Sequence, residues 1–126
     1  MANTVLVVDQ DPAARKSIEV LLDSQGYQVA AVGCSEDACR YLETRTPAVV
    51  LTALKLFGAD GFTLCRFIKR LPFTSVVYAV SAYLQEYGVD QLINAGFDGH
   101  LKKPINANVV AAAVRGAFDR LNNLNN

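Results

Sequence analysis

Short apolar runs alternate with amphipathic segments along the whole chain, and this alternation constrains the fold more than any other feature. The runs cover residues 5–8, 27–32, 49–51, 76–80 and 99–101. Most of them are continuously apolar, which is typical of strands that are buried on both faces of a parallel sheet. Strands that alternate regularly with helices predict an α/β fold in which a doubly wound parallel sheet carries helices on both faces.

The segments between these runs carry helix start and stop signals. Asp11 followed by Pro12 is typical of an N-cap and a first helical residue, and Ser35 and Asp60 can cap the next two helices. We expect a fourth helix at about residues 84–95 and a fifth at about residues 106–121. The apolar residues expected to face inward include these from the third and fourth helices: Leu64, Phe67, Ile68, Val89, Leu92 and Ile93.

Length and charge limit the domain count and the class of partner. A chain of 126 residues suits one domain, which we place at 1–121, with 122–126 as a frayed tail or the start of a linker. Twelve basic and twelve acidic side chains cancel, which argues against nucleic acid and membrane surfaces as partners. No apolar run approaches the roughly 18 residues of a membrane span, and no signal-peptide pattern opens the chain. We therefore expect a cytoplasmic protein.

Metal-ligating side chains are sparse in the sequence. Cys34, Cys39 and Cys65 lack metal-type spacing and are expected to be free thiols, and a single histidine excludes a multi-histidine site. In doubly wound sheets the functional crevice lies at the carboxyl ends of the strands. The residues to examine are therefore 9–11, 52–58, 81–83 and 102–104.

Five motifs at these strand ends occur in a recognisable order. They are Val7-Val8-Asp9-Gln10-Asp11-Pro12, Pro47 through Ala53, Asp60-Gly61, Val80-Ser81-Ala82, and Ala95-Gly96-Phe97-Asp98-Gly99 leading to Lys103-Pro104. Their order and spacing resemble the receiver domain of response regulators over roughly residues 4–121. The resemblance implies a flavodoxin-like (βα)5 sandwich with strand order 2-1-3-4-5. It also implies that helices one and five cover one face and helices two to four the other.

The departures from the family pattern fall on its reactive residues. Receiver domains phosphorylate an aspartate, using Mg²⁺ that is held by an acidic pair, the acceptor and a backbone carbonyl. In this chain the acceptor position is Ala53, the second acid is replaced by Gln10, and Asp9 is the acid that remains. Asp11 is better explained as a helix cap than as a metal ligand. A methyl group cannot form an acyl phosphate, so we expect no enzymatic activity.

The charge of the pocket leads to the same expectation for metal binding. A typical receiver pocket carries a net charge of about −2, whereas Asp9 and Lys103 give this one a net charge near zero. Lys55 either adds a further positive charge or points into solvent. We therefore expect no Mg²⁺ and no cofactor, and an ion pair between Asp9 and Lys103 in their place.

The resemblance also identifies switch and interface positions. Ser81 and His100 stand at the family's switch positions, and Phe57 stands where proline is usual, either as a packing residue or as a partner contact. Receiver domains commonly bind partners through the face made by the fourth helix, the fifth strand and the fifth helix. In this chain the candidate residues on that face are Tyr83, Tyr87, His100, Lys102 and Arg115.

These observations favour a non-phosphorylatable receiver domain that acts as a protein-interaction module in a bacterial two-component pathway. Two alternatives stay open: a small-ligand sensor that uses the vacated pocket, and a phosphorelay receiver that uses a different acid. Arg66, Lys69 and Arg70 form only a modest basic cluster, which is more typical of a solvated helix face than of a nucleic-acid site. A homodimer is compatible with the sequence.

Overall fold

The computed structural model describes residues 4–124, and its sheet has the predicted topology. Five strands pair in parallel in the order β2-β1-β3-β4-β5. The strands are β1 (Thr4–Val8), β2 (Gln28–Val32), β3 (Val49–Ala53), β4 (Val76–Ser81) and β5 (Gly99–Lys102). The helices are α1 (Pro12–Ser24), α2 (Ser35–Leu42), α3 (Gly61–Lys69), α4 (Val89–Ala95) and α5 (Ala107–Leu124), with a short 3₁₀ turn, η1 (Leu84–Glu86), before α4.

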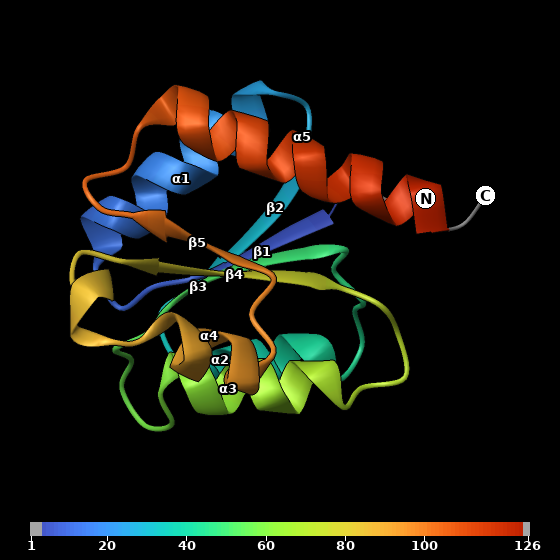
Figure 1. The fold of residues 1–126 in the computed structure, drawn as a ribbon. Coiled ribbons are helices and arrows are strands. Elements are labelled where there is room, and N and C mark those ends of the chain that lie inside the picture. Colours follow the sequence, from blue (N-terminus) through green and yellow to red (C-terminus); the bar gives the residue numbers. More distant parts are fainter. Residues whose placement is uncertain (1–3, 125–126) are drawn as a thin grey trace.

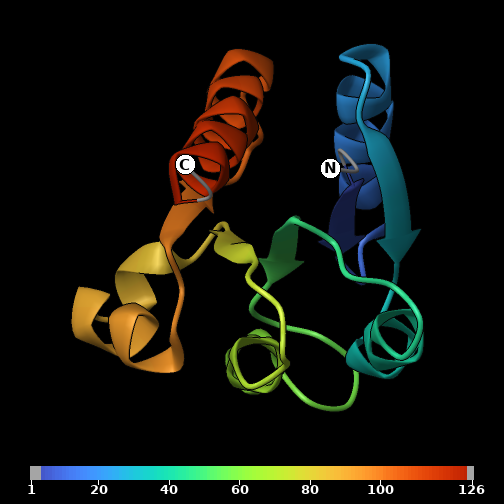
Figure 2. The same cartoon turned by 90° about the vertical axis from the view of Figure 1, so that its right-hand side faces the viewer.

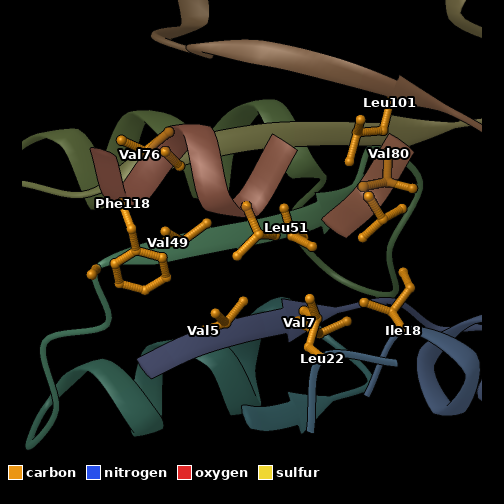
Figure 3. Close-up of a cluster of buried hydrophobic side chains, with 14 of the residues drawn as sticks. Val5, Val7, Ile18, Leu22, Val49, Leu51, Val76, Val80, Leu101 and Phe118 are labelled. Atoms are coloured by element: carbon orange, nitrogen blue, oxygen red, sulfur yellow. The ribbon is translucent and has the colours of Figure 1, made fainter. Parts of the chain in front are cut away.

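Helices cover both faces of the sheet in the predicted 2 + 3 arrangement (Figure 1). Side chains of β1 and β3 pack against Ile18 and Leu22 of α1 and against Phe118 of α5 on one face (Figure 3). The other face is covered by α2, α3 and α4, which contribute Ala38, Ile68 and Leu92 to a second apolar cluster. The sheet is therefore buried on both sides, and its polar side chains are confined largely to the ends of the strands.

Helix caps follow the sequence signals at two of the three predicted positions. The Asp11 carboxylate accepts a hydrogen bond from Ala13 N at 3.0 Å, and the Asp60 carboxylate accepts one from Thr63 N at 2.9 Å. Ser35, by contrast, is the first residue of α2, and Cys34 takes the N-cap position without a side-chain hydrogen bond. Ser35 is buried and lies one residue beyond the cap position that the sequence suggested for it.

The predicted fourth helix is divided into η1 and α4. The prediction that Val89 and Ile93 face inward is wrong. Gly88 has an extended backbone and serves as the N-cap of α4, so that η1 is separated from the helix proper. Leu92 and Ala95 form the buried stripe of this seven-residue helix, whereas Val89 and Ile93, one turn apart on the adjoining stripe, are 62% and 61% exposed. Phe67 of α3 is 41% exposed and belongs to neither apolar cluster.

The C-terminal helix is longer than the sequence boundary suggested. Helix α5 continues to Leu124, three residues beyond the expected boundary at residue 121. Residues 125 and 126 lie outside the described part. Within residues 4–124, no helix combines the length and the apolar character that a membrane crossing requires.

Substitutions at Gly61 and Gly116 test how closely the start of α3 packs against the end of β3. A Cβ atom on Gly61 would clash with the Ala53 carbonyl oxygen and lie 2.9 Å from Leu54 Cα, whereas a Cβ on Gly116 of α5 would meet nothing within 4 Å. We expect Gly61→Ala to lower the free energy of unfolding by about 1–3 kcal/mol, because backbone must move. Gly116→Ala should raise it by about 0.5–1 kcal/mol through helix propensity.

Urea denaturation of the two variants and the wild type measures both changes. Equal effects of the two substitutions would contradict the close approach between Gly61 and the end of β3.

Candidate functional site

The carboxyl edge of the sheet brings the predicted site residues together. Asp9 follows β1, Ala53 ends β3, Ser81 ends β4 and Lys103 follows β5. They line a cavity of about 150 Å³, together with Gln10, Asp11, Leu54, Lys55, Val80, Ala82 and Tyr83. All six residues that the sequence assigned to the degenerate pocket therefore border one cavity.

The predicted ion pair between Asp9 and Lys103 lies at the centre of this site. Lys103 Nζ is 2.7 Å from Asp9 Oδ2, while Asp9 Oδ1 accepts a hydrogen bond from Asp11 N at 3.0 Å. The ammonium approaches Oδ2 outside hydrogen-bond geometry, so Oδ2 is charge-paired and has no hydrogen-bond donor. Because Asp9 is only 3% exposed, its charge depends on this lysine for compensation.

The lysine itself is positioned by backbone. Lys103 N donates a hydrogen bond to the carbonyl oxygen of Ser81 at 3.0 Å, which fixes the start of the loop after β5 against the end of β4. The Ser81 hydroxyl accepts a hydrogen bond from Tyr83 N at 3.0 Å and is buried. Ser81 therefore holds the loop after β5 through its backbone carbonyl and the turn after β4 through its side chain.

A buried methyl group stands at Ala53, the position that the sequence analysis matched to the phosphate acceptor. Ala53 is 5% exposed, and its neighbour Thr52 is fully buried with its hydroxyl donating to the Ala53 carbonyl oxygen at 2.9 Å. Thr52 does not line the cavity. The Ala53 side chain thus offers neither a nucleophile nor a metal ligand.

The donor set at this edge does not fit Mg²⁺. Two acidic and two basic side chains line the cavity (Asp9, Asp11, Lys55 and Lys103), so their formal charges cancel. Asp9 faces an ammonium group, Asp11 caps α1, and Gln10 is a neutral amide. Mg²⁺ requires a near-octahedral set of oxygen ligands and prefers carboxylates. Within residues 4–124, no cluster of three His, Cys, Asp or Glu side chains could hold a metal ion.

Lys55 lines the cavity, but the ion pair of Asp9 is with Lys103 and not with Lys55. Its Nζ is 4.8 Å from the centre of the Tyr83 ring, which is a cation–π contact, and its side chain is exposed. Lys55 belongs to the loop after β3, and Tyr83 belongs to the loop after β4. The contact therefore links the two loops that border the cavity, a role that neither sequence-based alternative for Lys55 included.

Arg15 is a site residue that the sequence reasoning missed. Its Nη1 donates a hydrogen bond to the Asp9 carbonyl oxygen at 2.9 Å. A Cβ atom on Gly33 would lie 2.9 Å from the same Nη1, so the guanidinium depends on the open space at this glycine. The sequence could have indicated this position through its spacing from the helix cap, because Arg15 follows Asp11 by one helical turn. The Arg15 amide donates a hydrogen bond to the Asp11 carbonyl oxygen at 3.0 Å.

Four of the five predicted interface residues are exposed: Tyr83, His100, Lys102 and Arg115. Tyr87 is the exception, because its ring packs against Phe62 with centroids 5.3 Å apart and joins the core beneath α4. In its place, Val89 and Ile93 contribute exposed apolar surface to the same side of the molecule. The candidate face is thus more apolar than the sequence suggested.

Comparison with known sequences places these features in a family. The response regulator receiver domain family matches residues 5–115. Fimbriae Z protein of Salmonella typhimurium is 32% identical over 114 residues, which cover 89% of this chain and 54% of that protein. Transcriptional regulatory protein AfsQ1 of Streptomyces coelicolor is 28% identical over 117 residues, which cover 93% and 52%. The chain spans about half the length of these curated relatives.

Solved structures give the same result. A CheY-like receiver domain from Methylobacillus flagellatus has a TM-score of 0.83 and 27% identity, covering 93% of this chain and 99% of that one. A two-component response regulator from Clostridium difficile shares the fold, with a TM-score of 0.88 at 22% identity over 94% of this chain and 98% of that one. The family match over most of the chain, the strand order and the placement of the strand-end motifs lead to one conclusion: the chain belongs to the response regulator receiver domain family.

Proposed function

We propose that this receiver domain signals by binding a protein partner and is not switched by phosphoryl transfer. The observation that carries the proposal is the ion pair between Asp9 and Lys103 beside Ala53. In this pocket a lysine neutralises the remaining buried acid, and a methyl group stands where a phosphoryl group would be attached.

The chemistry of the pocket supports this proposal. Formation of an acyl phosphate needs a carboxylate that attacks the donor, together with positive charge to offset what develops on the phosphoryl oxygens. The two acids that line the cavity are engaged: Asp9 with Lys103 and with Asp11 N, and Asp11 with Ala13 N. Recruiting either acid as an acceptor would first break contacts that hold the loop after β1. The domain is therefore proposed to be non-enzymatic.

Apolar groups exposed beside β5 support a protein partner. Tyr83, Val89 and Ile93 are each more than half exposed. Tyr83 directly precedes η1, and Val89 and Ile93 belong to α4. His100 and Lys102 are exposed on the neighbouring strand β5. Aromatic and aliphatic groups bordered by polar and basic side chains are typical of protein interfaces. We propose a bacterial two-component signalling protein as the partner of this face.

The vacated pocket gives less support to a small-ligand sensor. Its volume is about 150 Å³, and pockets that bind drug-sized ligands typically have about 300–1,000 Å³. The Asp9–Lys103 pair also occupies the polar groups that would orient a ligand. We therefore do not propose this function.

Incubation with acetyl phosphate and excess Mg²⁺ tests the absence of phosphoryl transfer. We expect the intact mass of the wild-type protein to stay unchanged, because Ala53 has no nucleophile and the pocket lacks a magnesium donor set. Ala53→Asp should restore labelling only weakly, since Gln10 still withholds a metal ligand. The Ala53→Asp, Gln10→Asp double variant should label faster.

Two results would contradict this account. One is a phosphoryl adduct on any aspartate of the wild type. The other is equal labelling of the single and double variants, which would show that position 10 does not limit the chemistry.

Substitution of an exposed residue on α4 tests the partner face. Ile93 is 61% exposed, so Ile93→Ser should leave the fold intact while removing an apolar contact. We expect Ile93→Ser to lose most proteins that the wild type captures from an extract of its native cells, as quantified by mass spectrometry. Val20→Ser is the matched control, because Val20 is 54% exposed on α1. If Val20→Ser abolished the capture of these proteins and Ile93→Ser preserved it, the partner face would lie elsewhere.

A further inference from the structure

Tyr83 belongs both to the proposed partner face and to the lining of the pocket. It is 51% exposed, directly precedes η1, and borders the same cavity as Asp9 and Lys103. Among the described residues, no other member of the partner face lines that cavity. The face lies at the β5 edge of the molecule, where α4 is the outermost helix of its layer and α3 separates it from α2 (Figure 2). Tyr83 therefore connects the pocket to the partner face.

The backbone of Tyr83 is held on both sides, but its ring has few neighbours. The Tyr83 N–H donates to the buried Ser81 hydroxyl at 3.0 Å, and the Tyr83 carbonyl oxygen accepts a hydrogen bond from Glu86 N at 3.0 Å. The ring belongs to neither apolar cluster and, within residues 4–124, stacks on no other aromatic ring. Its contact with Lys55 Nζ, 4.8 Å from the ring centroid, is therefore the interaction that favours one orientation of the side chain.

Lys55 is well placed to hold the ring. The residue before it, Leu54, is buried, and the Leu54 carbonyl oxygen accepts a hydrogen bond from Gly61 N at 2.9 Å. The backbone below the lysine is thus fixed, while the lysine side chain is exposed. In the described part of the chain, Lys55 forms no ion pair that would compete for its ammonium group. Without the lysine, the Tyr83 side chain would be free to exchange between rotamers.

The orientation of an exposed ring matters for binding, because an interface must order its anchoring side chains. A side chain that is already held in its bound orientation loses less conformational entropy on association. Tyr83 is still 51% exposed with the lysine in place, so the contact leaves room for a partner on the same side chain. The free energy of a cation–π contact at an exposed site corresponds to about a two- to fivefold change in an equilibrium constant.

We propose that Lys55 is a positioning residue for the partner face: its ammonium group holds the Tyr83 ring in the orientation that the partner binds. Lys55 is not itself part of the face. The inference rests on the proposed function, because it concerns the same face. The loop after β3 thereby controls the surface beside α4 without a phosphoryl group at Ala53.

NMR tests the contact itself, without a partner. The ring current of an aromatic side chain shifts protons above its face upfield. The ε-methylene protons of Lys55 should therefore resonate upfield of those of Lys16, which is 73% exposed. Tyr83→Phe keeps the ring and should keep this upfield shift, whereas Tyr83→Leu should abolish it. Lys55 ε-protons that Tyr83→Leu leaves unchanged would overturn the proposal.

Partner binding tests the positioning role. The probe is the set of native-cell proteins that the wild type captures and Ile93→Ser does not, quantified by mass spectrometry. We expect Lys55→Met to lower their recovery about two- to fivefold and Lys55→Arg to restore it, because a guanidinium group also binds aromatic rings. Lys16→Met is the matched control for loss of charge, because Lys16 is exposed on α1, and it should recover these proteins like the wild type.

A double variant separates positioning from direct contact with the partner. If Lys55 acts through the ring, Lys55→Met should have no further effect in a Tyr83→Leu background. A further loss in that background, no loss in Lys55→Met alone, or no rescue by Lys55→Arg would overturn the proposal while leaving the partner face intact. If Ile93→Ser loses none of the captured proteins, the partner face itself is refuted, and the positioning role is refuted with it.

Discussion

A parallel sheet that is buried on both faces confines this molecule's polar chemistry to the ends of its strands. Side chains of β1 and β3 point into apolar clusters on both sides, against α1 and α5 on one face and against α2, α3 and α4 on the other. A charged side chain within such a strand would have to be desolvated without a partner. Asp9, Ser81 and Lys103 instead stand at or just beyond strand ends, where the loops supply hydrogen-bond partners and the strands bring them together.

The Asp9–Lys103 pair compensates the buried charge at this edge of the sheet. Asp9 is almost completely buried, and burial of an unpaired carboxylate is costly. Lys103 at 2.7 Å supplies the opposite charge, while Arg15 binds the Asp9 carbonyl oxygen and so holds the same turn from the α1 side. We interpret the acid and the lysine as structural partners in this chain.

The sequence predicted the fold more completely than it predicted the surface. Apolar strands and caps such as Asp11 and Asp60 depend on local rules, so the strand order and the layers followed from them and from the family resemblance. Side-chain exposure on short helices depends on tertiary contacts instead. Val89 and Ile93 of the short helix α4 are exposed, and the Tyr87 ring packs against Phe62 at the edge of the core. The Lys55–Tyr83 contact joins two loops, and nothing in the local sequence indicates it.

The central claim is that the pocket holds one state without a phosphoryl group, and NMR relaxation dispersion on the free protein tests it most directly. A receiver domain that phosphorylation can switch needs two conformational states close in free energy. Shifting the population ratio of two states from 1:99 to 99:1 needs about 5.5 kcal/mol of differential binding. The account predicts flat dispersion profiles for the amides of Ser81, His100 and α4 in the wild type, and exchange in Lys103→Met, where Asp9 loses its counter-charge. Widespread microsecond-to-millisecond exchange at these amides in the wild type would show two populated states and contradict the account.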